Sequence, residues 1–376
     1  MSPSSSSSST SILPVLAASF AAGAAASYAL QSLVQEHYRH PYNLPSPIRQ
    51  SPYGPHAQLA VQLARNAGAN MRSYYDLKGT KEQTDDQLRI HTKSRPNDLC
   101  THIDIANEQL ITEGIQQRFP DHVIIGEESV GSGSVPPLTN EPTWIIDPID
   151  GTTVGVRQIG RRKKGLYSSA HTTLIFSIQQ SFAAGLPTCC VSIGFCVNGK
   201  PIMGVVFAPM LDELYIAVRG YGAFRNGRQL YTSPREQTLK LADAIVGFEL
   251  GYVSQDREIA AAVGTIESIL RHGCRSTRQI GSCVLDLCNI ASGRYNVFYC
   301  GVAGEGGSPW DLCAGYVIAT EAGCVMESFY PPQEAPASTC SISNTEFDVY
   351  SRDEICASNP QLLEEIRAIV KQKALV

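Results

Sequence analysis

The segment Thr143–Thr153 (TWIIDPIDGTT) places two aspartates directly after a short apolar run. The run from Trp144 to Ile146 is rich in residues that favour a β-strand. Asp147 and Asp150 follow it, on either side of a proline that stiffens the turn. A charged side chain is costly to bury unless an opposite charge or a cation accompanies it. The fold therefore has to bring the end of this strand to a partner that neutralises two carboxylates.

Three further acids also stand at the ends of apolar elements. Glu127 and Glu128 follow the β-rich run His122–Gly126, and Asp311 opens a helix that the apolar spacing predicts over residues 310–322. Clustered carboxylates repel one another and resist ionisation unless a cation neutralises them. An all-oxygen ligand set suits a hard ion such as Mg²⁺, and two nearby ions suit hydrolysis of a phosphate ester.

The residues after Asp150 allow two interpretations. A helix that began at Gly151-Thr152-Thr153 would present free N–H groups to a phosphate beside the ions. In the simpler interpretation, Asp150 is a turn residue and helix N-cap, and Glu127 and Glu128 are solvated loop acids. Each segment taken alone leaves both interpretations open.

The composition excludes several classes of protein. Hydrophobic residues make up 43% of the 376 positions and charged residues 17%, which is typical of a globular protein. The net charge of −5 provides no basic excess for binding nucleic acid. The 12 cysteines include no C-x-x-C pair and lie mostly in apolar surroundings, which predicts buried free thiols in a reducing compartment.

The N-terminal part differs from the rest of the chain. Residues 1–35 carry no charged side chain, and residues 12–34 are long enough to cross a bilayer although only weakly hydrophobic. The basic n-region of a signal peptide and the arginines of a mitochondrial presequence are both missing. We expect a cytoplasmic protein and leave two alternatives open for this leader, a membrane anchor through residues 12–34 or a disordered or mispredicted segment.

Prolines and apolar periodicity divide the remaining chain. The five prolines between residues 41 and 55 predict a linker without regular helix, so that residues 1–55 form leader and linker and residues 56–376 one catalytic domain. Apolar spacing also predicts helices over residues 56–73, 103–118 and 360–370. Further strands are predicted over residues 191–197, 202–207 and 354–357.

Three motifs in this order resemble the inositol monophosphatase family of magnesium-dependent, lithium-sensitive phosphatases. They are GEES at 126–129, WIIDPIDGTT at 144–153 and WDLCAGYVIATEAG at 310–323, and the resemblance covers about residues 56–370. It implies an α/β fold, the layered αβαβα sandwich shared with fructose-1,6-bisphosphatase, usually as a homodimer. It also implies that a metal-bound water attacks a phosphate monoester directly.

The resemblance assigns metal ligands residue by residue. The first ion would be held by Glu127, Asp147 and the carbonyl of Ile149. The second would be held by Asp147, Asp150 and Asp311, while a third, weaker ion would contact Glu127. Glu127 would thereby take part in catalysis, and Asp150 and Asp311 would also contact the substrate.

The resemblance also assigns the residues around water and substrate. Thr152, with Asp104 behind it, would orient and help to deprotonate the attacking water, and the amides of Gly151 and Thr152 would hold the phosphate. The backbone at Cys283 and the carboxylate of Glu305 would contact the inositol ring. Glu305 departs from the pattern, because it lies six residues before Asp311 where the family has seven.

Residues 154–180 are the larger departure, since the family pattern resumes only at Ser181. Joining Thr153 to Ser181 gives DPIDGTTSFAAGLPTCCVSIGF, which fits the family far better. The segment begins with Val, whose codons start with GT, and ends with Gln, which CAG can encode. We hypothesise an intron retained in the gene model. The alternative is a genuine surface loop with a basic tip at residues 161–164.

The function favoured by these residues is Mg²⁺-dependent hydrolysis of inositol monophosphate to myo-inositol and phosphate. One alternative is a sibling phosphatase for a sugar phosphate, histidinol phosphate or a nucleotide, although Thr153 stands where nucleotide bisphosphatases more often have lysine. Another, of a different class, is a catalytically weak, membrane-tethered interaction protein, which the leader and residues 154–180 would suit.

Overall fold

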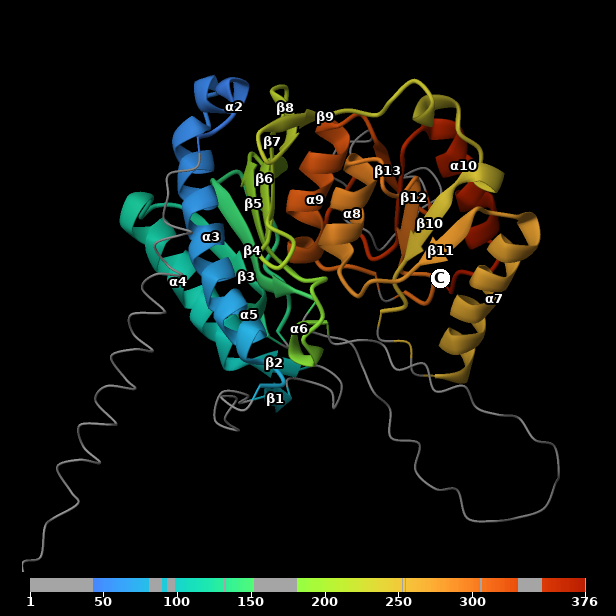
Figure 1. Cartoon of the computed structure of the whole chain (residues 1–376), viewed down its shortest axis with the longest axis horizontal. Helices are drawn as coiled ribbons and strands as arrows, with labels where there is room; N and C mark the ends of the chain where they lie inside the picture. Colours follow the sequence, from blue (N-terminus) through green and yellow to red (C-terminus); the bar gives the residue numbers. More distant parts are fainter. Residues whose placement is uncertain are drawn as a thin grey trace, which may run out of the picture. The chain divides into compact units, whose positions relative to one another are not determined.

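Two β-sheets and three layers of helices stack in the order α, β, α, β, α (Figure 1). The computed structural model describes residues 43–80, 90–92, 99–131, 133–151, 181–251, 253, 255–304, 306–330 and 347–375. This stacking confirms the αβαβα sandwich expected from the sequence.

The first sheet has seven strands in the order β3-β4-β5-β6-β7-β8-β9, and only β3 and β4 run parallel. Its strands are β3 (Val123–Gly126), β4 (Thr143–Asp150), β5 (Cys190–Val197), β6 (Lys200–Ala208), β7 (Glu213–Val218), β8 (Gly222–Arg225) and β9 (Arg228–Leu230). Every residue of β4 is buried. Burial along the whole strand explains why its apolar residues are continuous rather than alternating.

Helices cover both faces of this sheet. The helices α3 (Gly54–Leu77) and α4 (His102–Arg118) lie on the outer face, and α8 (Cys283–Ala291) and α9 (Pro309–Glu321) fill the layer between the sheets (Figure 1). Helix α9 packs closely against β6, because a Cβ atom at Gly204 would overlap the carbonyl of Ala314. Gly323, with φ of 92°, follows α9 as the predicted C′ glycine.

The second sheet has five strands in the order β11-β10-β12-β14-β13. They are β10 (Ile245–Phe248), β11 (Ser276–Arg278), β12 (Val297–Cys300), β13 (Val325–Ser328) and β14 (Glu354–Ala357). The helices α7 (Asp256–His272) and α10 (Pro360–Val370) cover its outer face (Figure 1). Shorter elements are β1 (Ile90–Thr92), β2 (Leu99–Thr101), α5 (Glu127–Val130), α6 (Ser181–Ala184) and the 3₁₀ turns Glu236–Thr238 and Leu241–Asp243.

The prediction that residues 41–55 contain no regular helix is wrong. Helix α2 (Ser46–Gln50) lies in this stretch, and α3 begins at Gly54. Both helices carry a proline in the first turn, where the missing N–H leaves no hydrogen bond unmade. The side chain of Ile48 is fully buried. The other predicted helices and strands are confirmed as α3, α4, α9, α10, β3, β4, β5, β6 and β14, with β4 continuing to Asp150.

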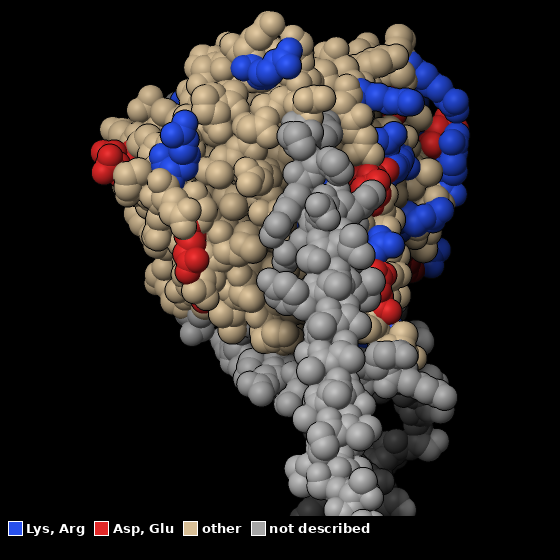
Figure 2. Space-filling view, turned by 60° about the vertical axis from the view of Figure 1, so that its left-hand side comes forward, with Lys and Arg blue, Asp and Glu red and all other residues tan. Residues whose placement is uncertain are grey.

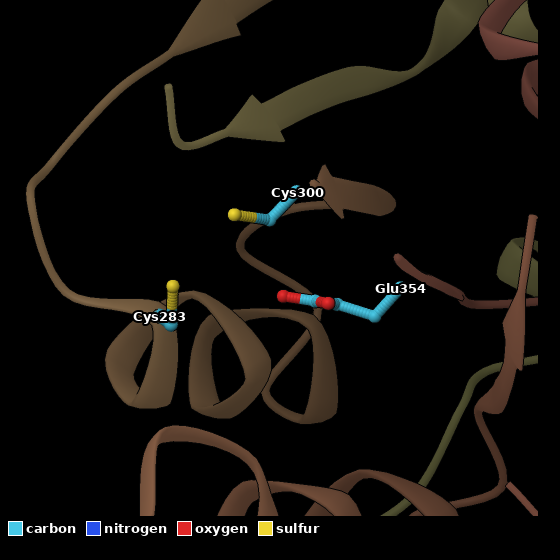
Figure 3. A group of neighbouring side chains, drawn as sticks. All are labelled: Cys283, Cys300 and Glu354. Atoms are coloured by element: carbon cyan, nitrogen blue, oxygen red, sulfur yellow. The ribbon is translucent and has the colours of Figure 1, made fainter. Parts of the chain in front are cut away.

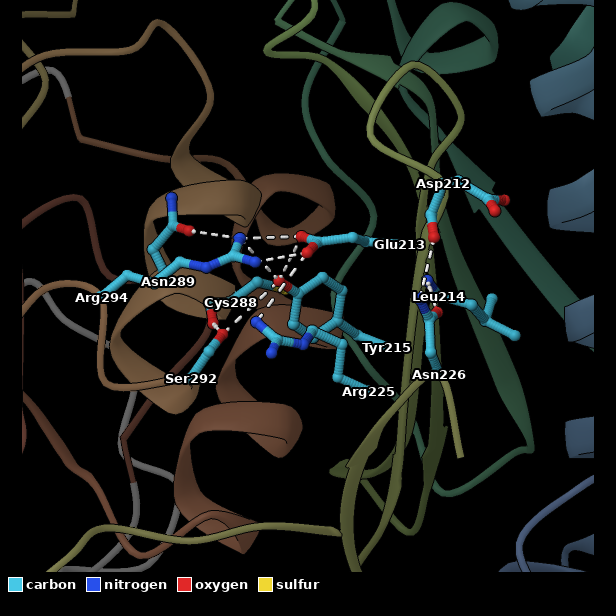
Figure 4. Close-up of polar contacts among 10 residues, drawn as sticks. All are labelled: Asp212, Glu213, Leu214, Tyr215, Arg225, Asn226, Cys288, Asn289, Ser292 and Arg294. Carbon is cyan, nitrogen blue, oxygen red and sulfur yellow. Dashed lines mark hydrogen bonds and ion pairs between the residues drawn. The ribbon is translucent and has the colours of Figure 1, made fainter. Parts of the chain in front are cut away.

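An ion pair ties the first sheet to the end of α8 (Figure 4). The guanidinium of Arg294 donates to the carboxylate of Glu213 at 2.8 Å, and the Tyr215 hydroxyl donates to the same carboxylate at 2.8 Å. Burial raises the pKa of Glu213, but these two hydrogen bonds and the charges of Arg294 and Arg225 outweigh burial and hold the pKa below its usual value. The ionised pair therefore anchors the turn that follows α8, and the N-terminus of α8 reaches the site described below.

Two sequence predictions fall partly on the described residues. The ten cysteines with described side chains are all free thiols, and most of them are buried, as predicted. Within the described part of the chain, no helix is long and apolar enough to span a membrane. On the face in Figure 2, Lys and Arg gather along the right-hand side with acids between them. The leader over residues 12–34 and residues 154–180 lie outside the described residues.

Candidate active site

Three aspartates converge where the first sheet meets α9. Asp147 and Asp150 come from the C-terminal end of β4, and Asp311 comes from the first turn of α9. One carboxylate oxygen of each lies within 4.8 Å of the others. Asp147 and Asp150 are almost fully buried, and Asp311 is partly exposed. We call these three residues the acid cluster.

An irregularity in β4 explains how two of these side chains reach the same place. Residues three apart in a regular strand point to opposite faces of the sheet. The pairing of β4 with β5 shifts register between Asp147 and Asp150, as in a β-bulge. The Ile149 N–H also donates to Asp147 Oδ1 at 3.0 Å, which tightens the turn. The bulge thus turns both carboxylates toward α9.

Helix α8 holds the Asp150 carboxylate from the other side. Its N-cap residue Ser282 donates its hydroxyl to Asp150 Oδ2, and the Val284 N–H donates to the same oxygen at 3.0 Å. Burial and the charge of Asp311 raise the pKa of Asp150 well above its usual value. Cys283, between the two donors, opens α8, so the structure brings this predicted residue beside the acid cluster.

Asp311 is fixed by its own helix. The Ser308 N–H donates to Asp311 Oδ2 at 2.7 Å as part of a capping box. Burial, with the nearby charge of Glu127, raises the pKa of Asp311 to about 6. Three carboxylates with mutual repulsion in a buried place form a site that a divalent cation would stabilise. The oxygen-only donor set fits a hard cation.

Glu108 is a site residue that the sequence analysis missed. It is buried on α4, and its carboxylate accepts the N–H groups of Glu128 at 2.7 Å and Ser129 at 2.8 Å. A Cβ atom at Gly126 would overlap this carboxylate, so the glycine is required for the contact. Glu108 therefore fixes the turn that carries Glu127. A usable signal was its position four residues after Asp104, on the buried face of α4.

Asp104 has a structural partner on its own helix. The N–H of Thr101 donates to Asp104 Oδ2 at 2.8 Å as part of the capping box of α4, and the Thr101 hydroxyl donates to the same oxygen at 2.5 Å. Its predicted partner Thr152 lies outside the described residues, as does Glu305. The roles predicted for Asp104, Thr152 and Glu305 stay predictions.

Gly151 joins the acid cluster to α6. Its φ is 98°, and a Cβ atom there would lie 2.9 Å from the Thr188 carbonyl oxygen, so that only glycine fits. The Gly151 carbonyl accepts the N–H of Phe182 at 3.2 Å. In an α-helix this bond joins residues four positions apart. Without residues 154–180, Phe182 would be the fourth residue after Gly151, and Gly151 would be the N-cap of a continuous helix.

The resemblance predicts Glu127 as a metal ligand, so replacing Glu108 with Gln should reduce turnover by about 10- to 100-fold, the usual cost of losing a residue that orients a metal ligand. Glutamine retains the volume of Glu108 but accepts the two N–H groups with one oxygen instead of two. Steady-state phosphate release over a divalent-metal titration would measure the effect. Glu113→Gln, at an exposed position of α4, is the matched control. Equal rates in the two variants would contradict a role for Glu108.

Comparison with known proteins identifies relatives over most of the chain. The model of the inositol monophosphatase family matches residues 54–375. Inositol monophosphatase 3 from Solanum lycopersicum is 37% identical over 305 residues, which are 81% of this chain and 92% of that protein. Inositol monophosphatase 1 from Sus scrofa is 32% identical over 307 residues, which are 82% of this chain and 91% of that protein.

A solved structure shares the fold. The structure of inositol monophosphatase from Anabaena (Nostoc) sp. PCC 7120 matches with a TM-score of 0.60 and 24% sequence identity. The match covers 86% of this chain and 98% of that one. The layered architecture described above is therefore the architecture of that structure.

Proposed function

Since the chain belongs to the inositol monophosphatase family and is therefore a phosphatase, we propose that it hydrolyses inositol monophosphate to myo-inositol and phosphate. The observation that carries the proposal is the convergence of Asp147, Asp150 and Asp311 beside Gly151. Carboxylates gathered at a helix start suit a phosphate ester, because a cation and backbone N–H groups can act on the same group.

We propose Mg²⁺ as the ion, because the acid cluster offers only carboxylate oxygens. Asp147, Asp150 and Asp311 would hold one ion, and Glu127, Asp147 and the carbonyl of Ile149 would hold a second. When bound, Mg²⁺ would supply a nucleophile at neutral pH and stabilise charge on the phosphoryl and leaving oxygens. The N–H donors to Asp150 and Asp311 keep both carboxylates in place before the ion binds.

The chain's own groups would orient substrate and water. The amides of Gly151 and Thr152 would hold the phosphate, and Thr152 with Asp104 would accept the proton from the attacking water. The backbone at Cys283 and the Glu305 carboxylate would contact inositol hydroxyls. We further propose that the protein is a homodimer, as the resemblance implies.

The test is phosphate release from inositol 1-phosphate by the full chain and by a variant lacking residues 154–180. Mg²⁺ is titrated and then removed with a chelator. A sugar phosphate, histidinol phosphate and a nucleotide monophosphate are compared at equal concentration. Metal-dependent turnover that is highest for inositol 1-phosphate supports the proposal. Failure of both chains on this substrate, or faster turnover of another ester, overturns it.

A further inference from the structure

A second group of potential ligands lies apart from the acid cluster. It consists of Cys283 at the start of α8, Cys300 at the end of β12 and Glu354 at the start of β14. The two sulfur atoms and a carboxylate oxygen lie within 4.8 Å of one another. Figure 3 shows the Glu354 carboxylate and the two thiols facing a common space. We call these three residues the thiol cluster.

One oxygen atom of the thiol cluster has no hydrogen-bond partner among the described residues. Glu354 is fully buried, and its Oε1 accepts the Gly307 N–H at 2.9 Å. Its Oε2 is buried and has no hydrogen-bond partner among the described residues. A buried carboxylate oxygen without a partner is destabilising unless a proton or a cation supplies the missing interaction. The unpartnered oxygen lies on the carboxylate that faces the two thiols (Figure 3).

The backbone around Glu354 restricts where its carboxylate can go. A Cβ atom at Gly306 would lie 2.6 Å from Glu354 Oε2, so the chain passes directly against this oxygen. The Gly306 N–H donates to the Arg352 carbonyl at 3.0 Å, which fixes this approach. The carboxylate is therefore held toward the thiols by packing rather than free to turn to solvent.

We propose that Cys283, Cys300 and Glu354 bind a thiophilic divalent cation, with Zn²⁺ as the best match. Two sulfur ligands distinguish this site from the acid cluster, because soft thiolates select zinc over magnesium. With Zn–S bonds of about 2.3 Å, two sulfurs on a tetrahedral ion lie about 3.8 Å apart, so that the two thiols need to approach each other by about 1 Å or less. Three protein ligands leave the fourth position open.

The proposed ion would act next to the acid cluster without sharing its ligands. Cys283 stands between Ser282 and Val284, the two residues that donate hydrogen bonds to Asp150. A cation on Cys283 would therefore be coupled through the first turn of α8 to the position of Asp150. Through this coupling, a thiophilic metal bound at the thiol cluster would affect hydrolysis at the acid cluster.

The test uses Co²⁺ as a spectroscopic probe on the reduced full chain. Thiolate ligation of Co²⁺ produces a sulfur-to-metal charge-transfer absorption in the near ultraviolet, which oxygen ligands do not produce. We expect this absorption to saturate at one ion per chain and to disappear when Zn²⁺ is added. Losing a residue that only orients a metal ligand weakens metal binding by about 10- to 100-fold. Cys300→Ser or Glu354→Gln removes a proposed ligand itself, so each should weaken Co²⁺ binding at least as much.

Three further variants separate the sites and guard against misfolding. Cys283→Ser changes a partly exposed side chain, and circular dichroism checks that the chain stays folded. Asp147→Asn, in the acid cluster, should leave the absorption unchanged, and so should Cys274→Ser, which removes a thiol that is not part of the thiol cluster. Absence of the absorption in the unaltered chain, or its persistence in folded Cys283→Ser, overturns the proposal. Its loss in Asp147→Asn would also overturn it.

Discussion

Replacing Asp311 with Asn should reduce phosphate release from inositol 1-phosphate by roughly 100- to 1000-fold, the usual effect of removing one group that stabilises transition-state charge. Asparagine retains an oxygen that can accept the Ser308 N–H, so the start of α9 should stay capped. The substitution removes one negative charge from the acid cluster and with it part of the cation affinity. Asp243→Asn, on an exposed 3₁₀ turn, is the matched control.

The same substitution should change how stability depends on pH. Burial and Glu127 raise the pKa of Asp311 to about 6 in the folded protein, above its ordinary value of 3.8. A raised carboxyl pKa stabilises the folded state most below the unfolded pKa, and this contribution is lost as the pH rises through about 6. Without divalent metal, the difference in unfolding free energy between the unaltered chain and Asp311→Asn should therefore change mostly between about pH 4 and pH 6.

Urea unfolding in the presence of chelator measures this difference. At pH 7 the variant should be the more stable of the two metal-free proteins, because it lacks the repulsion. Addition of Mg²⁺ should reverse the order, since only the unaltered acid cluster binds the ion tightly. If the order of stability of the two proteins were the same with and without Mg²⁺ and at every pH, a cation site at Asp311 would be contradicted.

Removing residues 154–180 should increase phosphate release by at least about 100-fold, because a misplacement of about 1 Å at a reacting group can cost that much in rate. The Phe182 N–H already donates to the Gly151 carbonyl at 3.2 Å, as in the first turn of a helix. In the shortened chain, Thr152 and Thr153 would complete that turn. Their amides would then face the phosphate together beside Asp150.

A second variant separates continuity of the helix from loss of bulk. Replacing residues 154–180 with a Gly/Ser linker of equal length keeps Thr153 and Ser181 apart in sequence, so its activity should stay near that of the full chain. Equal activity of the deletion, linker and full chains would show that the insertion is tolerated. Sequencing of mature transcripts then addresses its origin. Reads that pass continuously through codons 154–180 would exclude the retained intron.

Local patterns were enough to predict β4 and α9, which carry the acid cluster, but not α8, which holds the Asp150 carboxylate. Helical spacing from Ala60 to Ala67 predicted α3, and the run of apolar residues before Asp147 predicted β4. Helical spacing and apolar runs reflect interactions between residues close together in the sequence. They can therefore be recognised in the amino-acid sequence alone. The prediction that residues 41–55 contain no regular helix failed because a proline in the first turn of a helix looks the same in sequence as one that breaks it.

The sequence by itself determined the family, the order of the layers and which acids stand at the ends of apolar elements. The resemblance already predicted which of those acids share an ion, but only the tertiary structure shows how they meet. The register shift in β4 turns Asp147 and Asp150 toward Asp311, and Glu108 reaches across from α4 to hold the turn of Glu127. Likewise, the pairing of β12 with β14 places Glu354 opposite Cys300, and the start of α8 brings Cys283 to them. Contacts between residues far apart in sequence depend on packing distances, which no local pattern encodes.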